Sequence, residues 1–332
     1  MNHKKRTYGW LMAVLVTALL AAVLLGLCFG STPLNIAQVL TGLFHPGGDG
    51  VESRILWVVR LPHVAGCALA GCALAVSGLL LQTATGNPLA GPNVIGVNAG
   101  AGFALVLGLS FAPMAYGLQP LLAFCGAFGC SLLIVFLSRQ VGGGRVTLVL
   151  SGVAVSALLS AGISALRLLY PDRTQGYTAF SVGGVENVGF ERMAVPALIT
   201  AAVICCGAVL SPRLDLLCLG DDLASALGAR VKLLRITALL LASGAAAAAV
   251  SFAGLLGFVG LMVPHMARRL AGQGSTRRLL WVSALLGACL VILADLLGRV
   301  LFAPSQLPAG IVTAVIGAPF FFGLLMQRRE VL

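Results

Sequence analysis

Long apolar stretches, separated by short polar or turn-rich segments, recur along most of the chain. Most of them hold about 20 residues, the length at which an α-helix crosses roughly 30 Å of hydrocarbon. The pattern therefore predicts an all-α, polytopic membrane protein. Eight of these stretches are interpreted directly as spans, at residues 9–30, 63–82, 93–111, 118–138, 146–169, 193–211, 281–303 and 308–327.

The uncharged run 236–264 is too long for one comfortable span and short for two. As a single helix it would extend about 43 Å. Basic residues flank it on both sides, so the run must cross the membrane twice if both flanks are cytoplasmic. The AGLLGFVG stretch at 253–260 supplies glycines for a tight outer turn. We therefore expect spans at 233–253 and 256–270, ten in all, with both termini in the cytoplasm.

Composition and charge agree with this interpretation. Of the 332 residues, 59% are hydrophobic and 9% are charged, whereas a soluble domain carries about 25% charged residues. The net charge of +11 would suggest nucleic acid as the partner of a soluble protein. Here it is better explained by Lys and Arg in cytoplasmic loops, where the ten-span arrangement places most of the 21 basic residues. We expect membrane lipid as a partner and no nucleic acid.

The start of the chain allows two interpretations. Lys4, Lys5 and Arg6 before an apolar stretch are also typical of a signal peptide. The stretch is long enough to span the membrane, however, and no small-x-small cleavage motif ends it. Leu27 before Cys28 disfavours lipoprotein processing. We expect a retained first span.

Motifs for catalysis, nucleotide binding or metal binding are missing from the sequence. The four histidines are scattered, and His265 lacks the second histidine of a zinc-binding H-E-x-x-H helix. The nine cysteines lie mostly inside apolar runs, where they are expected to pack as small residues. None of the three lysines stands in a phosphate-binding loop. We expect no enzyme, and no metal or cofactor bound to this chain.

Two positions inside or beside the predicted spans are candidates for function. Asp295 is the one acidic residue within a predicted span, and such a group is functional by default. Arg299, four residues on, offers the alternative of an intrahelical ion pair, and both interpretations stay open. His265 follows Pro264 near a helix exit, where it is expected to bind backbone freed by the proline.

A short helix is predicted outside the membrane, within the connecting segment at about 212–232. Either of two aspartates can cap its start, three apolar residues would share one face, and a glycine would end it. Such a helix either folds back onto its own bundle or fills the groove of a partner protein. Its candidate residues are Asp221, Asp222, Leu223, Ala224, Leu227 and Gly228.

The chain is expected to form one permease domain, residues 1–332, without a separate soluble domain. A weak internal sequence similarity between AVSGLLLQ (75–82) and AVSFAGLLG (249–257) is compatible with two inverted halves of five helices each.

Several long stretches together resemble one family. They are RLPHVAGCALAGCALAVSGLLLQ (60–82), GNPLAGPNVIGVNAGAG (86–102), LSGVAVSALLSA (150–161), LGDDLASALGA (219–229), GFVGLMVPHMARRLAG (257–272), GACLVILADLLGR (287–299) and LPAGIVTAVIGAPFFFGLL (307–325). In this order they are similar to the FecCD-type permeases of ABC transporters that import iron siderophores, haem or cobalamin. Residues 31–59 and 170–192 match only loosely.

The resemblance implies the subunit organisation and the setting. The chain would be a transport subunit of the bacterial cytoplasmic membrane, working with a second copy of itself, two ATP-binding subunits that hold ATP and Mg, and an extracytoplasmic binding protein. Ferric siderophore is the first choice of cargo, with haem or cobalamin as alternatives. A more remote alternative is an ion-coupled secondary transporter, which would normally carry carboxylates near the bilayer midplane.

The resemblance also implies residue roles. The helix at 219–229 would sit in a cleft of the ATPase, and Arg60 and Arg299 would dock the binding protein. Where the family often has a second arginine after Arg60-Leu-Pro, this chain has His63, so that contact is in doubt. A structural motif at the inner gate would comprise Pro264, His265, Arg268 and Asp295.

Overall fold

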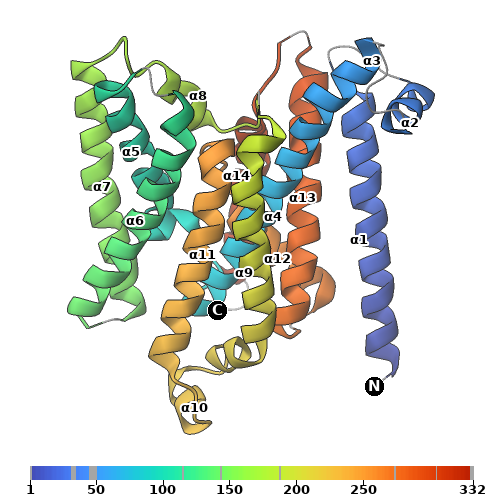
Figure 1. Cartoon of the computed structure of the whole chain (residues 1–332). Helices are drawn as coiled ribbons and strands as arrows, with labels where there is room; N and C mark the ends of the chain where they lie inside the picture. The colour runs from blue at the N-terminus through green and yellow to red at the C-terminus, as the bar shows by residue number, and fades with distance from the viewer. Residues whose placement is uncertain are drawn as a thin grey trace.

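The structure is a computed structural model, and every regular element in its described part is a helix (Figure 1). The all-α prediction is therefore confirmed. The described residues are 2–30, 35–44, 51–113, 116–142, 144–186, 188–272, 274–303 and 305–329.

The predicted spans correspond to helices of the bundle. Within the described residues, seven helical segments are long and apolar enough to cross a membrane, and α5 and α14 are shorter apolar helices. With α12, whose 13 residues extend about 20 Å, they make up the ten expected crossings. These helices are α1 (Asn2–Cys28), α4 (Leu61–Thr85), α5 (Val97–Phe111), α6 (Gln119–Gln140), α7 (Arg145–Leu169), α9 (Phe190–Leu217), α11 (Val231–Ala253), α12 (Val259–Ala271), α13 (Thr276–Leu301) and α14 (Ala309–Arg329).

The reversal predicted inside the long uncharged run is present between α11 and α12. Gly254 adopts a φ of +65°, and a Cβ there would lie 2.5 Å from the carbonyl oxygen of Phe180, so glycine is required. The turn is covered, because the Leu255 amide donates to that same oxygen at 2.9 Å. The covering segment belongs to α8 (Gly176–Val182), in the region 170–192.

The second span begins earlier than its hydropathy suggested. A continuous helical segment runs from α3 (Val51–Arg54) through a wide π-type turn (Ile55–Arg60) into α4. The polar residues of this segment resemble those of a loop, so the predicted start of the span at residue 63 was wrong. A π-type turn adds one residue to the helical repeat, and such turns are frequent at functional positions.

Helix α4 lies at the centre of the bundle and is mostly buried (Figure 1). Its glycines allow very close backbone contacts, as is typical of helix packing in membranes. A Cβ at Gly71 would lie 2.0 Å from the carbonyl oxygen of Gly287 in α13, and one at Gly78 would lie 1.7 Å from that of Gly260 in α12. A displacement of α4 must therefore move α12 and α13 as well.

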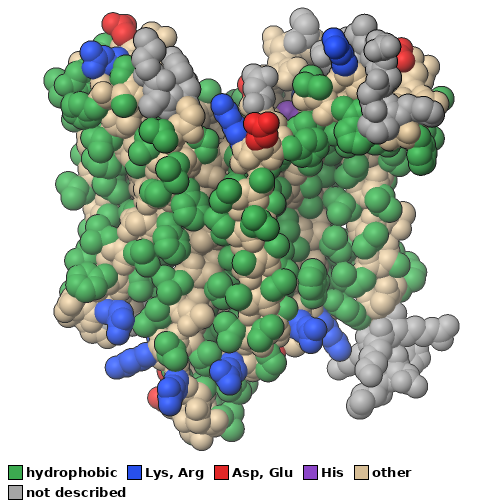
Figure 2. All heavy atoms as spheres, in the orientation of Figure 1, with side chains coloured by type: hydrophobic (Ala, Val, Ile, Leu, Met, Phe, Trp, Pro, Cys, Tyr) green, Lys and Arg blue, Asp and Glu red, His purple; other side chains and the backbone are tan. Residues whose placement is uncertain are grey.

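The two ends of the bundle differ in character. One end carries α2 (Ile36–Phe44), α3 and α8; the other carries α10 (Asp221–Ala226) and the start of α1 (Figure 1). We call them the α8 end and the α10 end. Figure 2 shows a broad apolar belt between the ends and basic side chains gathered around the α10 end. The relation between two inverted halves stays a prediction.

Candidate functional site at the two polar ends of the bundle

Helix α10 presents two leucines to its surroundings. Leu223 and Leu227 are 59% and 62% exposed, whereas Ala224 is fully buried against the bundle. The prediction that all three share one face was therefore wrong: the alanine faces inward and the leucines face outward. This division leaves an apolar surface outside the spans, available to a partner.

The boundaries of α10 are set by two glycines. Gly220, with a φ of +99°, occupies the N-cap position, and no side chain caps the helix. The expectation that Asp221 or Asp222 caps the helix was wrong, because both lie inside its first turn. The expected stop is confirmed, since Gly228 has a φ of +80° directly after the last turn.

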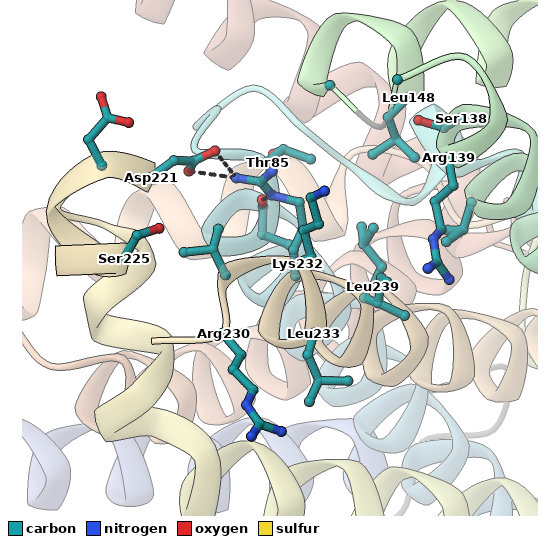
Figure 3. Close-up of a pocket in the computed structure, with 18 residues that line it drawn as sticks. Thr85, Ser138, Arg139, Leu148, Asp221, Ser225, Arg230, Lys232, Leu233 and Leu239 are labelled. Carbon is teal, nitrogen blue, oxygen red and sulfur yellow. Dashed lines mark hydrogen bonds and ion pairs between the residues drawn. The ribbon is translucent and has the colours of Figure 1, made fainter. Parts of the chain in front are cut away.

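Asp221 instead pairs with an arginine of α11. Its carboxylate accepts two hydrogen bonds from Nη2 of Arg235, at 2.7 and 2.9 Å (Figure 3). The Nε of the same guanidinium donates to the carbonyl oxygen of Ala84, near the end of α4, at 3.0 Å. Arg235 therefore connects α10, α11 and α4. The sequence pattern predicts only a cytoplasmic charge at this position.

A cavity of about 790 Å³ lies beside this connection (Figure 3). The first turn of α10 and the start of α11 form one wall, and the facing ends of α6 and α7 form another. Arg139 and Lys232 reach its rim, and Leu148 contributes to its apolar lining. Helix α10 is thus separated from α6 and α7 by open space.

The proline–histidine motif is in α12, as the sequence suggested. Pro264 is buried within the helix, and the His265 ring packs edge-on against Phe320 of α14, with centroids 5.9 Å apart. Arg268 donates to the side-chain oxygen of Gln82 in α4, and the amide nitrogen of Gln82 reaches the α12 backbone. The motif therefore joins α12 to α14 and to α4. Its structural role in gating stays a prediction.

Asp295 does not belong with that motif, so grouping it with the inner gate was wrong. It lies near the α8 end of α13, almost fully buried. Its Oδ1 is 2.9 Å from Nε2 of His63, and its Oδ2 accepts from Nε of Arg299 at 2.8 Å. The intrahelical pair with Arg299 is therefore present. His63, the position that departs from the family pattern, supplies the second partner.

Two buried arginines hold the end of α1. Arg60 and Arg299 are only 5% and 9% exposed. Arg60 donates to the carbonyl oxygens of Leu27 and Cys28, the latter at 2.9 Å. Arg299 donates to that of Phe29 at 3.2 Å. These carbonyls lie at the helix terminus, where intrahelical donors are lacking. We refer to Arg60, His63, Asp295 and Arg299 as the outer cluster.

The predicted docking role of the two arginines is not visible as an exposed surface. Their guanidinium groups face α1 and Asp295 inside the protein. A carboxylate of a binding protein would have to replace these partners or reach the cluster from its edge. The docking role stays a prediction.

Three potential metal ligands meet in the same place. The ligand atoms of His63, Cys67 and Asp295 lie within 4.8 Å of one another, and nitrogen with sulfur suits zinc. The guanidinium of Arg299 already contacts the carboxylate, however, and that of Arg60 lies nearby. Two positive charges oppose a dication here. We interpret the group as an ion-pair network, and the absence of a bound metal stays a prediction.

Comparisons with known proteins agree with this architecture. The model of the FecCD transport family matches residues 18–327. The Fe(3+)-citrate import system permease protein YfmE of Bacillus subtilis (strain 168) is 36% identical over 321 residues, 95% of each chain. The hemin transport system permease protein HmuU of Yersinia pestis is 36% identical over 285 residues, 83% of this chain and 84% of that protein.

A solved structure of a metal-chelate type ABC transporter, in an inward-facing conformation, has the same fold. Its TM-score is 0.82 at 27% identity, over 96% of this chain and 99% of that one. Together with the described helices, these similarities identify a multi-pass protein of the bacterial inner membrane. The chain belongs to the FecCD transport family, as a permease subunit of ABC importers and not an enzyme.

Proposed function

We propose that this chain is the membrane-spanning subunit of an ATP-driven importer for a metal chelate. It works as a homodimer with two separate ATP-binding subunits and an extracytoplasmic binding protein. The α10 end, with the basic side chains and both termini, faces the cytoplasm, as the positive-inside rule requires. The outer cluster then lies on the side from which the chelate arrives.

One observation carries the assignment of the ATPase contact. Leu223 of the six-residue helix α10 and Leu227, its C-cap residue, project beyond the spans at the basic end of the bundle. A helix this short is not stable by itself, so its position depends on the glycines that bound it and on Arg235. An exposed apolar pair held in a defined position is suited to the groove of a partner protein.

Ferric siderophore is the proposed cargo, and haem or cobalamin is the alternative. The named relatives are permeases for Fe(3+)-citrate and hemin, and both are 36% identical to this chain, so identity does not separate these cargoes. An ion-coupled secondary transporter is disfavoured by Asp295. Its two carboxylate oxygens contact Arg299 and His63, which leaves it poorly suited to bind a coupling ion.

Reconstitution tests the proposal. The permease is placed in proteoliposomes with its ATP-binding and binding-protein partners, and uptake of a ferric siderophore, haem or cobalamin is measured. We expect uptake of one chelate that requires ATP on the side of the membrane where the ATP-binding subunits lie. This uptake should continue when ionophores abolish ion gradients. Uptake that follows an ion gradient and proceeds without ATP would contradict the proposal.

A further inference from the structure

The connection made by Arg235 has an unusual position in the bundle. Its side chain is 14% exposed, and it binds a carboxylate of α10 and a backbone carbonyl of α4 at the same time. The partner carboxylate of Asp221 is 45% exposed, so α10 lies at the surface while the arginine lies inside. A single buried guanidinium thus spans the distance from the proposed ATPase contact to the central helix.

We propose that Arg235 is a positioning residue that transmits displacement of α10 to α4. The inference rests on the proposed function, because it needs an ATPase that moves α10. One nitrogen of the rigid, planar guanidinium, Nη2, donates to both oxygens of Asp221, while its Nε donates to the carbonyl oxygen of Ala84. The planar group therefore fixes the distance between Asp221 of α10 and the end of α4, which one flexible contact would not.

The surroundings of α10 direct the displacement along this route. On its other side the cavity of about 790 Å³ separates α10 from α6 and α7, so these helices do not back it directly. Other contacts of α10 with the bundle include the chain connections to α9 and α11 and the buried methyl group of Ala224. Among the described residues of α10, Asp221 provides the ion pair that reaches across to the bundle.

The end of α4 that Arg235 contacts is itself connected to other central helices. Ala84 lies in the last turn of α4, and Gln82, two residues earlier, binds Arg268 of α12. Two arginines from successive helices thus hold the same end of α4. Because α4 contacts α12 and α13 backbone to backbone at Gly78 and Gly71, it cannot shift alone. Movement at Ala84 becomes movement of the central helices.

The test measures coupling in the reconstituted complex. For Arg235→Ala we expect the amount of chelate transported per ATP hydrolysed to fall by about fivefold or more. Arg235→Lys keeps the charge but has a single nitrogen in place of the planar group that binds Asp221 and Ala84 at once, so its ratio is expected to lie between those of Arg235→Ala and the wild type. Arg230→Ala is the matched control, because that arginine is exposed and points away from Asp221 (Figure 3). We expect it to keep the wild-type ratio.

A second variant separates coupling from general damage. Asp221→Ala should lower the same ratio, and the double variant should be no worse than either single variant, since both remove one contact. Additive losses, or an unchanged ratio in Arg235→Ala, would overturn the proposal. If Arg235→Ala fails to assemble with the ATPase, Arg235→Lys provides the test. A wild-type ratio of chelate transported to ATP hydrolysed in that variant would refute the positioning role of Arg235. Failure of the proposed function would differ, because wild-type permease would then not bind the ATPase at all.

Discussion

Replacing both exposed leucines of α10 by aspartate, Leu223→Asp with Leu227→Asp, should separate the permease from its ATPase. Full burial of a leucine stabilises by about 1.5–3 kcal/mol. Leu223 and Leu227 are 59% and 62% exposed. Burial of each side chain in a partner groove can therefore still contribute more than half of this free energy. The pair is then worth roughly 3 kcal/mol, so the Kd for the ATPase subunit should rise about 100-fold.

The permease itself should tolerate the change. Both side chains face solvent, and substitutions at such positions usually alter stability by less than about 0.5 kcal/mol. The assay is a titration of purified permease in nanodiscs with the ATPase subunit, accompanied by thermal unfolding of each variant. The control is Leu118→Asp, compared with each single leucine variant, because it places one negative charge at a leucine that is 51% exposed near the α8 end.

The outcome distinguishes a contact surface from a helix folded onto its own bundle. A Kd within about threefold of wild type, with unchanged unfolding, would show that the leucines do not meet the ATPase. Equal weakening by the control variant would show a general effect of charge. A drop in permease stability alone would mean that the leucines pack within the chain.

Three further predictions concern topology, docking and the α12 motif. In a background without exposed native cysteines, Ser275→Cys should be modified from the cytoplasm and Ser305→Cys from outside, and modification of both from one side would refute the topology. Arg60→Glu with Arg299→Glu should weaken binding of the binding protein, and a Glu→Arg change on that protein should restore it; unaltered affinity and salt dependence would exclude docking there. His265→Ala should cost about 1–2 kcal/mol of stability through the lost contact with Phe320, and loss of a stoichiometric metal in that variant would contradict a structural role.

The fold could be predicted from the sequence because membrane spans depend on a local property. Each span is an uninterrupted apolar stretch, and glycines with flanking charges revealed the turn between α11 and α12. The start of the second span was missed for the same reason. The apolar pattern is interrupted by three charged residues, Glu52, Arg54 and Arg60. The helix nevertheless continues through them, because tertiary contacts accommodate the buried side chain of Arg60.

The site was predictable only where it is local. The stop of α10 at Gly228 was predicted from the local sequence, whereas the predicted aspartate cap was wrong because Gly220 occupies that position. The direction of its leucines does not follow from the local sequence, because Arg235, 14 residues from Asp221, and the buried Ala224 orient the helix. The contact between His63 and Asp295 joins residues 232 positions apart, and no pattern in a single sequence records such a pairing.

If the binding protein docks at the outer cluster, docking and the retention of α1 involve the same two arginines. The terminal carbonyls of α1 lack intrahelical donors and carry the negative end of the helix dipole. Arg60 and Arg299 satisfy them, and Asp295 offsets part of the added positive charge. A carboxylate from a binding protein offers the arginines a stronger acceptor than a carbonyl, yet it must reach groups that are nearly fully buried. Each guanidinium taken by the binding protein is one less donor for α1. Docking at this cluster and the position of α1 would then influence each other reciprocally.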